Sequence, residues 1–241
     1  MVNKGIFDRR RGTPATAASE ALTHDSFEMY RGNRQSDTEQ AYADKWTNLA
    51  DRLFNLDNAK QAHVVQFYTD DIFLRECICE FVRSALADNE SAIVVASKKH
   101  RHGLTERLQF RGVDVRGAIK QGRYIVLDAQ MMLEKFISGG LPDKRKFETI
   151  FAPAIESAQT ASGTGQGRVA VFGEMVALLW AEGNFEAALQ LENLWNELAK
   201  TRPFYLRCAY PATGFQGEHM SEPYSAVCSH HSAVISAESY T

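Results

Sequence analysis

Five polar side chains lie where short apolar runs of the sequence end. They are Tyr68, Ser97, Asp128, Glu174 and Tyr210. If these runs are parallel strands of one open sheet, their carboxyl ends meet at one edge, which is where such sheets bind ligands. Two phenols, a hydroxyl and two carboxylates at that edge predict a polar-lined pocket. Asp128 and Glu174 could equally cap the helices that follow, because carboxylates stabilise helix N-termini.

The turn after the first apolar run does not suit a phosphate group. Phosphate loops use glycines for close backbone approach and a lysine for charge, whereas Thr69-Asp70-Asp71 has neither. The two aspartates would also put negative charge where a phosphate would sit. The glycine-rich stretch 163–167 precedes an apolar run, which favours a flexible loop. No G-x-G-x-x-G, G-x-S-x-G or H-E-x-x-H motif occurs, so the sequence predicts no catalytic residue and no cofactor.

Cysteine and histidine residues form a second candidate site. Cys228 and His231 are three residues apart, a spacing that zinc sites use. His63 opens the first apolar run and Cys208 lies in the last one. A site of His63, Cys208, Cys228 and His231 requires the C-terminal segment to fold back, and its metal is unknown. It could not easily include Glu174, because His63 stands at the opposite end of its strand. The alternative is core packing or local hydrogen bonding.

A dense basic run, Lys98-Lys99-His100-Arg101-His102, follows the second apolar run. It would lie at the same edge as the polar side chains described first. The run is typical of a solvated helix start, and it could instead contact an anionic ligand or partner.

The elements that must position these groups alternate along the chain. Continuous apolar runs separated by amphipathic helices predict a parallel sheet covered on both faces. We therefore expect an α/β fold with a three-layer, open, mostly parallel sheet. The predicted strands are 63–68, 91–97, 123–129, 168–174 and 204–210, and the predicted helices are 70–87, 102–111, 131–137, 144–159, 175–181, 185–200 and 222–235.

Composition narrows the class of protein. Lys and Arg number 27 against 30 Asp and Glu, for a net charge of −3, so no basic excess points to nucleic acid or an anionic membrane. The longest apolar runs are far shorter than the ~20 residues of a membrane span, and residues 1–12 lack the apolar core of a secretory signal. The four cysteines form no C-x-x-C pair. We expect a cytoplasmic protein with reduced thiols and no direct contact with nucleic acid or membrane.

The first 60 residues differ from the rest of the chain. Residues 1–40 are polar and have few aliphatic side chains, which predicts a mobile extension. In 41–60, apolar residues recur at helical spacing, which predicts an amphipathic helix. That helix could pack on its own domain or dock a partner.

Several longer motifs together resemble one family. In this order and spacing they are similar to the MEDS domain, the methanogen/methylotroph sensory domain of a dichloromethane-responsive regulator. The resemblance covers residues 61–236. The motifs are HVVQFY at 63–68 with Asp70-Asp71, GRYIVLDA at 122–129, FGEMVALLW at 172–180 with Gly183-Asn184, LENLWN at 191–196, CAYP at 208–211 with Gly214-Phe215, and Cys228-x-x-His231-Ser232.

The resemblance implies a RecA/KaiC-like fold that lacks the phosphate loop. It also implies a sensor of small organic compounds such as hydrocarbon derivatives. Such domains are often joined to a histidine kinase or a DNA-binding domain. No kinase segment follows residue 236 and no helix-turn-helix precedes residue 61, so we expect a histidine kinase or transcription regulator to act as a separate partner.

Three hypotheses follow. The first is a non-catalytic sensor whose small organic ligand binds at the carboxyl ends of the strands. The second is a degenerate RecA-like nucleotide-binding protein or residual enzyme, with Glu174 as general base. The third is a thiol or metal sensor that uses the Cys/His site. For the first hypothesis, the predicted ligand contacts are Tyr68, Asp70, Asp128, Glu174, Trp180 and Tyr210.

Overall fold

The computed structural model describes residues 62–162 and 167–235. Six parallel strands form its main sheet, in the order β3-β2-β6-β7-β1-β8. The predicted α/β class is therefore confirmed. The strands are β1 (His63–Tyr68), β2 (Ser91–Ala96), β3 (Tyr124–Asp128), β6 (Val169–Gly173), β7 (Tyr205–Pro211) and β8 (Ala233–Ile235). A two-stranded antiparallel pair, β4 (Ile137–Ser138) and β5 (Leu141–Pro142), lies apart from the main sheet.

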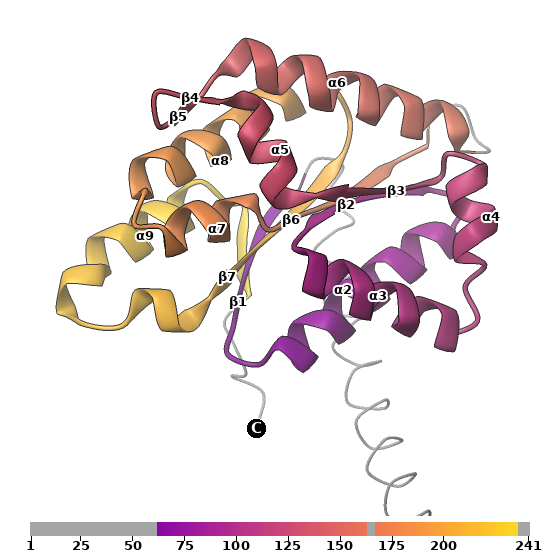
Figure 1. The fold of residues 1–241 in the computed structure, drawn as a ribbon, viewed down its shortest axis with the longest axis horizontal. Helices are drawn as coiled ribbons and strands as arrows, with labels where there is room; N and C mark the ends of the chain where they lie inside the picture. The colour runs from indigo at the N-terminus through magenta and orange to yellow at the C-terminus, as the bar shows by residue number, and fades with distance from the viewer. Residues whose placement is uncertain (1–61, 163–166, 236–241) are drawn as a thin grey trace, which may run out of the picture. The chain divides into compact units, whose positions relative to one another are not determined.

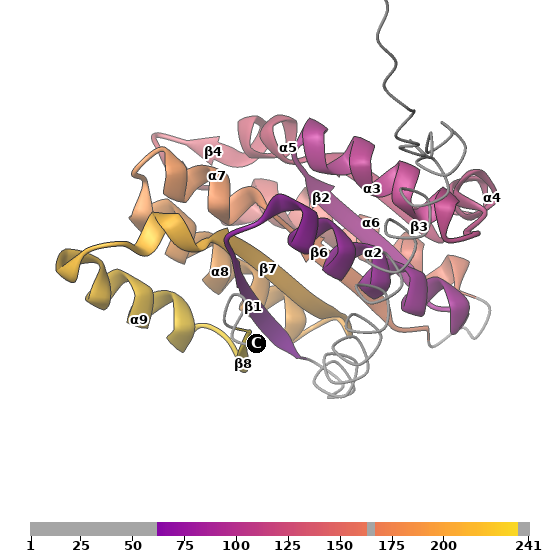
Figure 2. The same ribbon diagram turned by 90° about the horizontal axis from the view of Figure 1, so that it is seen from below.

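Helices cover both faces of the sheet, which makes the three predicted layers (Figures 1 and 2). One face carries α2 (Asp71–Ala87), α3 (Lys98–Phe110) and α4 (Val115–Lys120). The other face carries α5 (Ala129–Phe136), α6 (Lys144–Ala161), α7 (Met175–Ala181) and α8 (Phe185–Ala199). After β7 come the short 3-10 helices η1 (Ala212–Phe215) and η2 (Glu218–Met220), then α9 (Ser221–Ser229). None of the described helices is both long and apolar enough to cross a membrane.

The core is divided by the sheet into two apolar clusters. Because side chains alternate along a strand, β1 sends Val65 and Phe67 to the cluster under α5–α8 and Val64 and Tyr68 to the cluster under α2–α4. The first of these two faces is called the α8 face below. This alternation decides which of the predicted site residues can meet.

One helix boundary and one additional helix differ from the sequence-based expectations. Helix α3 begins at Lys98 rather than 102, because the Ser97 side chain caps it by accepting a hydrogen bond from the His100 N–H. Helix α4 was not predicted, and Asp114 caps it in the same way. The predicted extensions 1–40 and 41–60, and 163–166 of the glycine-rich stretch, lie outside the described residues.

The predicted helix 222–235 is wrong beyond Ser229. Helix α9 ends there, and the following residues form β8, which pairs with Val64–Gln66 of β1. The edge of β1 offers unpaired backbone N–H and C=O groups, and a short strand satisfies them. Ser232 starts the pairing, since its hydroxyl accepts from the His63 N–H at 3.0 Å and donates to the His63 carbonyl at 2.8 Å.

Replacing Ser232 should therefore loosen this edge. The change Ser232→Ala removes both hydroxyl bonds and leaves a buried N–H unpaired, which is expected to lower the free energy of unfolding by about 2 kcal/mol. Urea denaturation measures the effect. The control is Ser229→Ala, which loses one exposed bond to the Ala226 carbonyl and should change stability by less than about 0.5 kcal/mol. Equal losses in both variants would contradict the anchoring role.

Candidate functional site

The polar side chains predicted at the strand ends fall on two faces of the sheet. In the register of β1 and β7, Phe67 pairs with Tyr210 and Tyr68 pairs with Pro211. Tyr210 therefore points to the α8 face, whereas Tyr68 points toward α2 and α3. The structure therefore does not form a single pocket that contains both phenols. The predicted ligand contacts must be described as two separate groups.

The first group surrounds Glu174, which is buried at the end of β6. One carboxylate oxygen accepts a hydrogen bond from the Ser97 N–H at 2.8 Å, and the other is paired with Nδ1 of His100. Glu174 precedes α7 but its side chain makes no cap bond. Pairing with Glu174 raises the pKa of His100 above its usual 6.5. Burial, Glu174 and Asp71 raise the pKa of the Tyr68 phenol well above its ordinary value.

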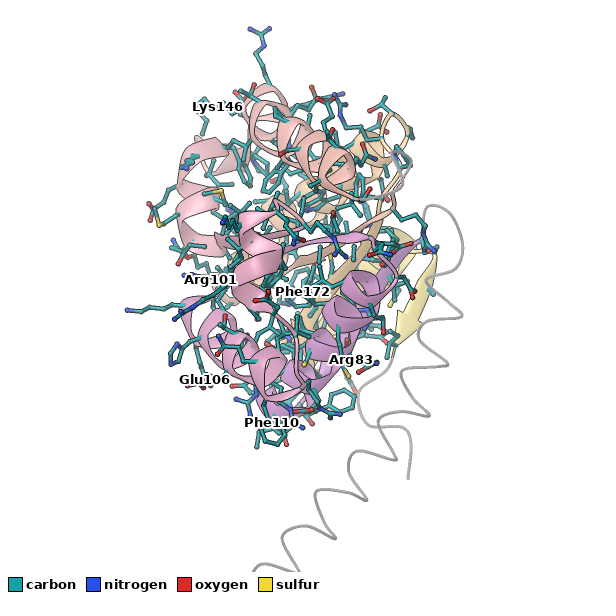
Figure 3. The ribbon with its side chains drawn as sticks, turned by 90° about the vertical axis from the view of Figure 1, so that its right-hand side faces the viewer. Arg83, Arg101, Glu106, Phe110, Lys146 and Phe172 are labelled. Carbon is teal, nitrogen blue, oxygen red and sulfur yellow. The ribbon has the colours of Figure 1, made fainter. Side chains whose placement is uncertain are left out.

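The basic run of α3 supplies the partners for carboxylates at this edge. Lys99 pairs with Asp71, His100 with Glu174, and Arg101 with Asp128. Asp128 also caps α5, because it accepts from the Met131 N–H at 3.0 Å. These two interactions lower the pKa of Asp128, with the backbone bond contributing most. Figure 3 shows Arg101 and Phe110 near the two ends of α3.

Asp70 has a structural role in the same region. Its side chain caps α2 by accepting a hydrogen bond from the Ile72 N–H at 2.6 Å. The N-terminus of α2 thus carries Asp70 and Asp71, both of them negative. This arrangement disfavours a phosphate at the position where a phosphate loop would hold one.

The second group is an aromatic pocket at the carboxyl ends of β1 and β7. The cavity has a volume of about 430 Å³, within the range of small-molecule sites. Tyr210 and Trp180 stand behind it, since both rings contact Phe215. Trp180 is fixed by a hydrogen bond from Nε1 to the Gly214 carbonyl at 3.0 Å. The lining residues are Phe67, Ala212, Phe215, Gly217, Met220, Ser221 and Tyr224.

A third feature, called the buried cluster below, lies deeper on the α8 face. His63 of β1, Glu192 of α8, Cys208 of β7 and His231 after α9 each place one donor atom within 4.8 Å of the others. Glu192 is completely buried, and Tyr210 donates its hydroxyl to Oε1 of Glu192 at 2.9 Å. The Cys208 thiol lies 3.2 Å from Oε2 of Glu192.

Burial and neighbouring charges together shift the pKa values of the ionisable groups in the buried cluster. Burial raises the pKa of Glu192, but His231 and His63 outweigh it and hold the pKa below its ordinary value. For Cys208 both causes act together, because burial and the Glu192 carboxylate each raise the pKa of the thiol. The same two causes raise the pKa of Tyr210. The carboxylate is thus ionised, while the Cys208 thiol and the Tyr210 phenol keep their protons.

The structure joins three of the four predicted Cys/His residues. Cys228 lies outside the buried cluster, half-buried on α9, where it raises the pKa of Tyr224 after the larger contribution of burial. Glu192 takes the fourth place and was not predicted as a site residue. A signal for it exists, because Glu192 occupies the same helical face as the buried residues Ala188, Leu191 and Trp195. A carboxylate on an apolar stripe needs a partner in the core.

The family profile described as "MEDS: MEthanogen/methylotroph, DcmR Sensory domain" matches residues 62–231. This match covers more than half of the 241 residues. The chain belongs to the MEDS family. A search of curated proteins found no match to it.

The MEDS match spans every site described above. It begins one residue before His63 and ends at His231, so it contains the whole buried cluster. The Glu174 group and the aromatic pocket lie within it as well. The sensory character of the family therefore applies to the part of the chain that carries these features.

The His100–Glu174 pair should make stability depend on pH. His100 faces Glu174 after β6, Asp71 on α2 and its neighbour Lys99. Because the pKa is raised in the folded state, the pair contributes fully below about pH 6.5 and its contribution is lost as the pH rises through the raised pKa. We expect His100→Gln to lower the free energy of unfolding by about 1–2 kcal/mol at pH 6 and by clearly less at pH 9.

Urea denaturation at the two pH values measures this difference. The control is His102→Gln, since the His102 side chain is 80% exposed and its Nε2 lies 3.4 Å from the exposed Glu106 carboxylate one turn later on the same helix. That variant should behave like the wild type at both values. A loss for His100→Gln that is the same at pH 6 and pH 9 would show that the charge of the pair contributes nothing.

Proposed function

We propose that this MEDS protein is a non-catalytic sensor of a small, mostly apolar organic compound that binds in the aromatic pocket. The observation that supports it most is the pocket itself, with three aromatic rings and a methionine at the carboxyl ends of two parallel strands. Ligands of open parallel sheets bind at such ends. The sensory character of the family supports the same role.

The lining of the pocket defines the class of ligand. Phe67, Phe215 and Met220 offer apolar surface, and the hydroxyls of Ser221 and Tyr224 are the polar groups of the side chains that line it. No charged side chain is among the lining residues of this described cavity. A ligand with a hydrocarbon or halogenated skeleton and at most one or two polar atoms fits this lining. Trp180 and Tyr210 lie behind this lining, in contact with Phe215.

The Glu174 group is less suited to bind such a ligand. Its carboxylates are already paired with Lys99, His100 and Arg101. A ligand there would have to break these ion pairs, whereas the aromatic pocket needs no such exchange. The negative N-terminus of α2 also disfavours the nucleotide alternative.

The pocket is built in a way that could transmit a signal. Five of its seven lining residues come from η1, η2 and α9, the segment that leads from β7 to β8. Tyr224 is partly exposed on this segment. We propose that ligand binding shifts this segment and that a separate histidine kinase or transcription regulator detects the shift, in keeping with a population change between two states.

Blocking the pocket tests the proposal. Ser221 lines the cavity and Ser225, one turn later on α9, does not. We expect a thermal-shift screen of short alcohols, haloalkanes and simple aromatic compounds to give a hit that stabilises the wild type and Ser225→Phe by a few degrees. The same compound should not stabilise Ser221→Phe, because the new ring fills the pocket.

Two further arms separate the alternatives. A hit retained in Ser221→Phe but lost in Glu174→Gln would move the ligand to the Glu174 group. Stabilisation by ATP–Mg²⁺ and by no organic compound would contradict the sensor proposal in favour of nucleotide binding. A hit that persists in both variants would contradict both placements.

A further inference from the structure

The buried cluster has the composition of a metal site. Two imidazoles, one thiol and one carboxylate come from four separate parts of the chain: β1, α8, β7 and the turn after α9. The β1 and β7 strands lie side by side in Figures 1 and 2, with α8 next to them. Zinc and other divalent first-row metals favour this set of nitrogen, sulfur and oxygen ligands.

The spacing of the donor atoms is close to that around one ion, since all four lie within 4.8 Å of one another. Nε2 of His63 lies 3.4 Å from the Cys208 Sγ and 3.2 Å from Oε2 of Glu192. The Cys208 Sγ lies 3.2 Å from the same oxygen, and Nε2 of His231 lies 3.4 Å from Oε1. A tetrahedral zinc with bonds of about 2.0–2.3 Å separates its ligands by about 3.3–3.8 Å.

The outer hydrogen bonds orient both imidazoles for coordination. Nδ1 of His231 lies 2.7 Å from the Val227 carbonyl, so it must carry the proton. Nδ1 of His63 lies 2.9 Å from Oδ1 of Asn196, whose amide nitrogen donates to the His230 carbonyl. Both Nδ1 atoms are therefore donors, and in the neutral rings both Nε2 lone pairs point into the cluster. Metal-bound histidines are held in this way.

One of the four donor atoms, Nε2 of His231, has no hydrogen-bond partner among the described residues. The His231 side chain is fully buried, yet its Nε2 has no hydrogen-bond partner, although it lies 3.4 Å from Glu192. A buried nitrogen without a partner is costly. A neutral imidazole lone pair and a carboxylate oxygen repel each other, and a cation between them, either a proton on Nε2 or a metal ion, would remove the conflict.

We infer that His63, Glu192, Cys208 and His231 bind one divalent transition-metal ion, zinc being the best fit. On binding, the Cys208 thiol loses its proton to solvent and a metal–thiolate bond forms, with no change of oxidation state. The thiolate and the carboxylate then balance the two positive charges, which suits a buried site. Four protein ligands complete a tetrahedron and leave no open position, as in structural zinc sites. This inference does not depend on the proposed function.

Cobalt binding by the chain of 241 residues tests it. After removal of bound metal with a chelator, the wild type should take up one Co²⁺ per chain, with visible bands of tetrahedral cobalt and a thiolate-to-cobalt charge-transfer band in the near ultraviolet. Zn²⁺ should displace the cobalt and abolish both. Cys208→Ser should lose the charge-transfer band and bind the ion at least about 100-fold more weakly, beyond the loss typical of an outer-shell change.

Two other cysteines serve as controls. Cys77→Ser removes a buried thiol on the opposite face of the sheet, and Cys228→Ser removes the half-buried thiol on α9. Both variants should keep the cobalt spectrum of the wild type. Loss of the band in Cys228→Ser instead of Cys208→Ser would overturn this ligand set. If Cys208→Ser does not fold, the wild-type spectrum alone decides, because the absence of a thiolate band overturns the inference.

Discussion

The α8 face depends on how a single buried carboxylate is satisfied. Glu192 has no exposed surface, and a carboxylate withdrawn from water costs several kcal/mol unless it is paired. Its partners come from β1, from β7 and from the turn between α9 and β8. The carboxylate therefore ties the C-terminal segment to the strand that opens the domain. Loss of one partner of such a buried group typically costs about 3–5 kcal/mol.

The fold was largely predictable because the strands are buried on both faces. Residues 63–68 and 91–96 are apolar enough to indicate strands without periodicity, and each is followed by a capped amphipathic helix. The end of the chain was not predictable in this way. Strand β8 has three residues, too few for any pattern, and it forms because the edge of β1 offers unpaired backbone groups. That reason is tertiary and has no local signal.

The candidate site was less predictable, and the register explains why. Tyr68 and Tyr210 both stand at strand ends, but Tyr210 pairs with Phe67 rather than with Tyr68. An offset of one residue sends a side chain to the other face of the sheet. The sequence allowed Asp128 to be either a ligand contact or a helix cap. Its pairing with Arg101 was not predictable, because it depends on how α3 packs. Glu192 could have been found from its place on the apolar stripe of α8.

The aromatic pocket and the buried cluster share one face of the sheet and are joined by one side chain. Tyr210 donates its hydroxyl to Glu192, and its ring packs against Phe67 and Phe215 of the pocket. The segment that lines the pocket also carries His231 into the buried cluster. In the proposed arrangement, an ion that holds His231 would restrict the motion of this segment, so an organic ligand would lose less entropy when it binds. Any such coupling must be reciprocal, because the free energy that links two binding sites is the same in either order of binding. Ligand binding in the pocket and metal binding in the buried cluster would then both act on the conformation of one segment, the chain between β7 and β8.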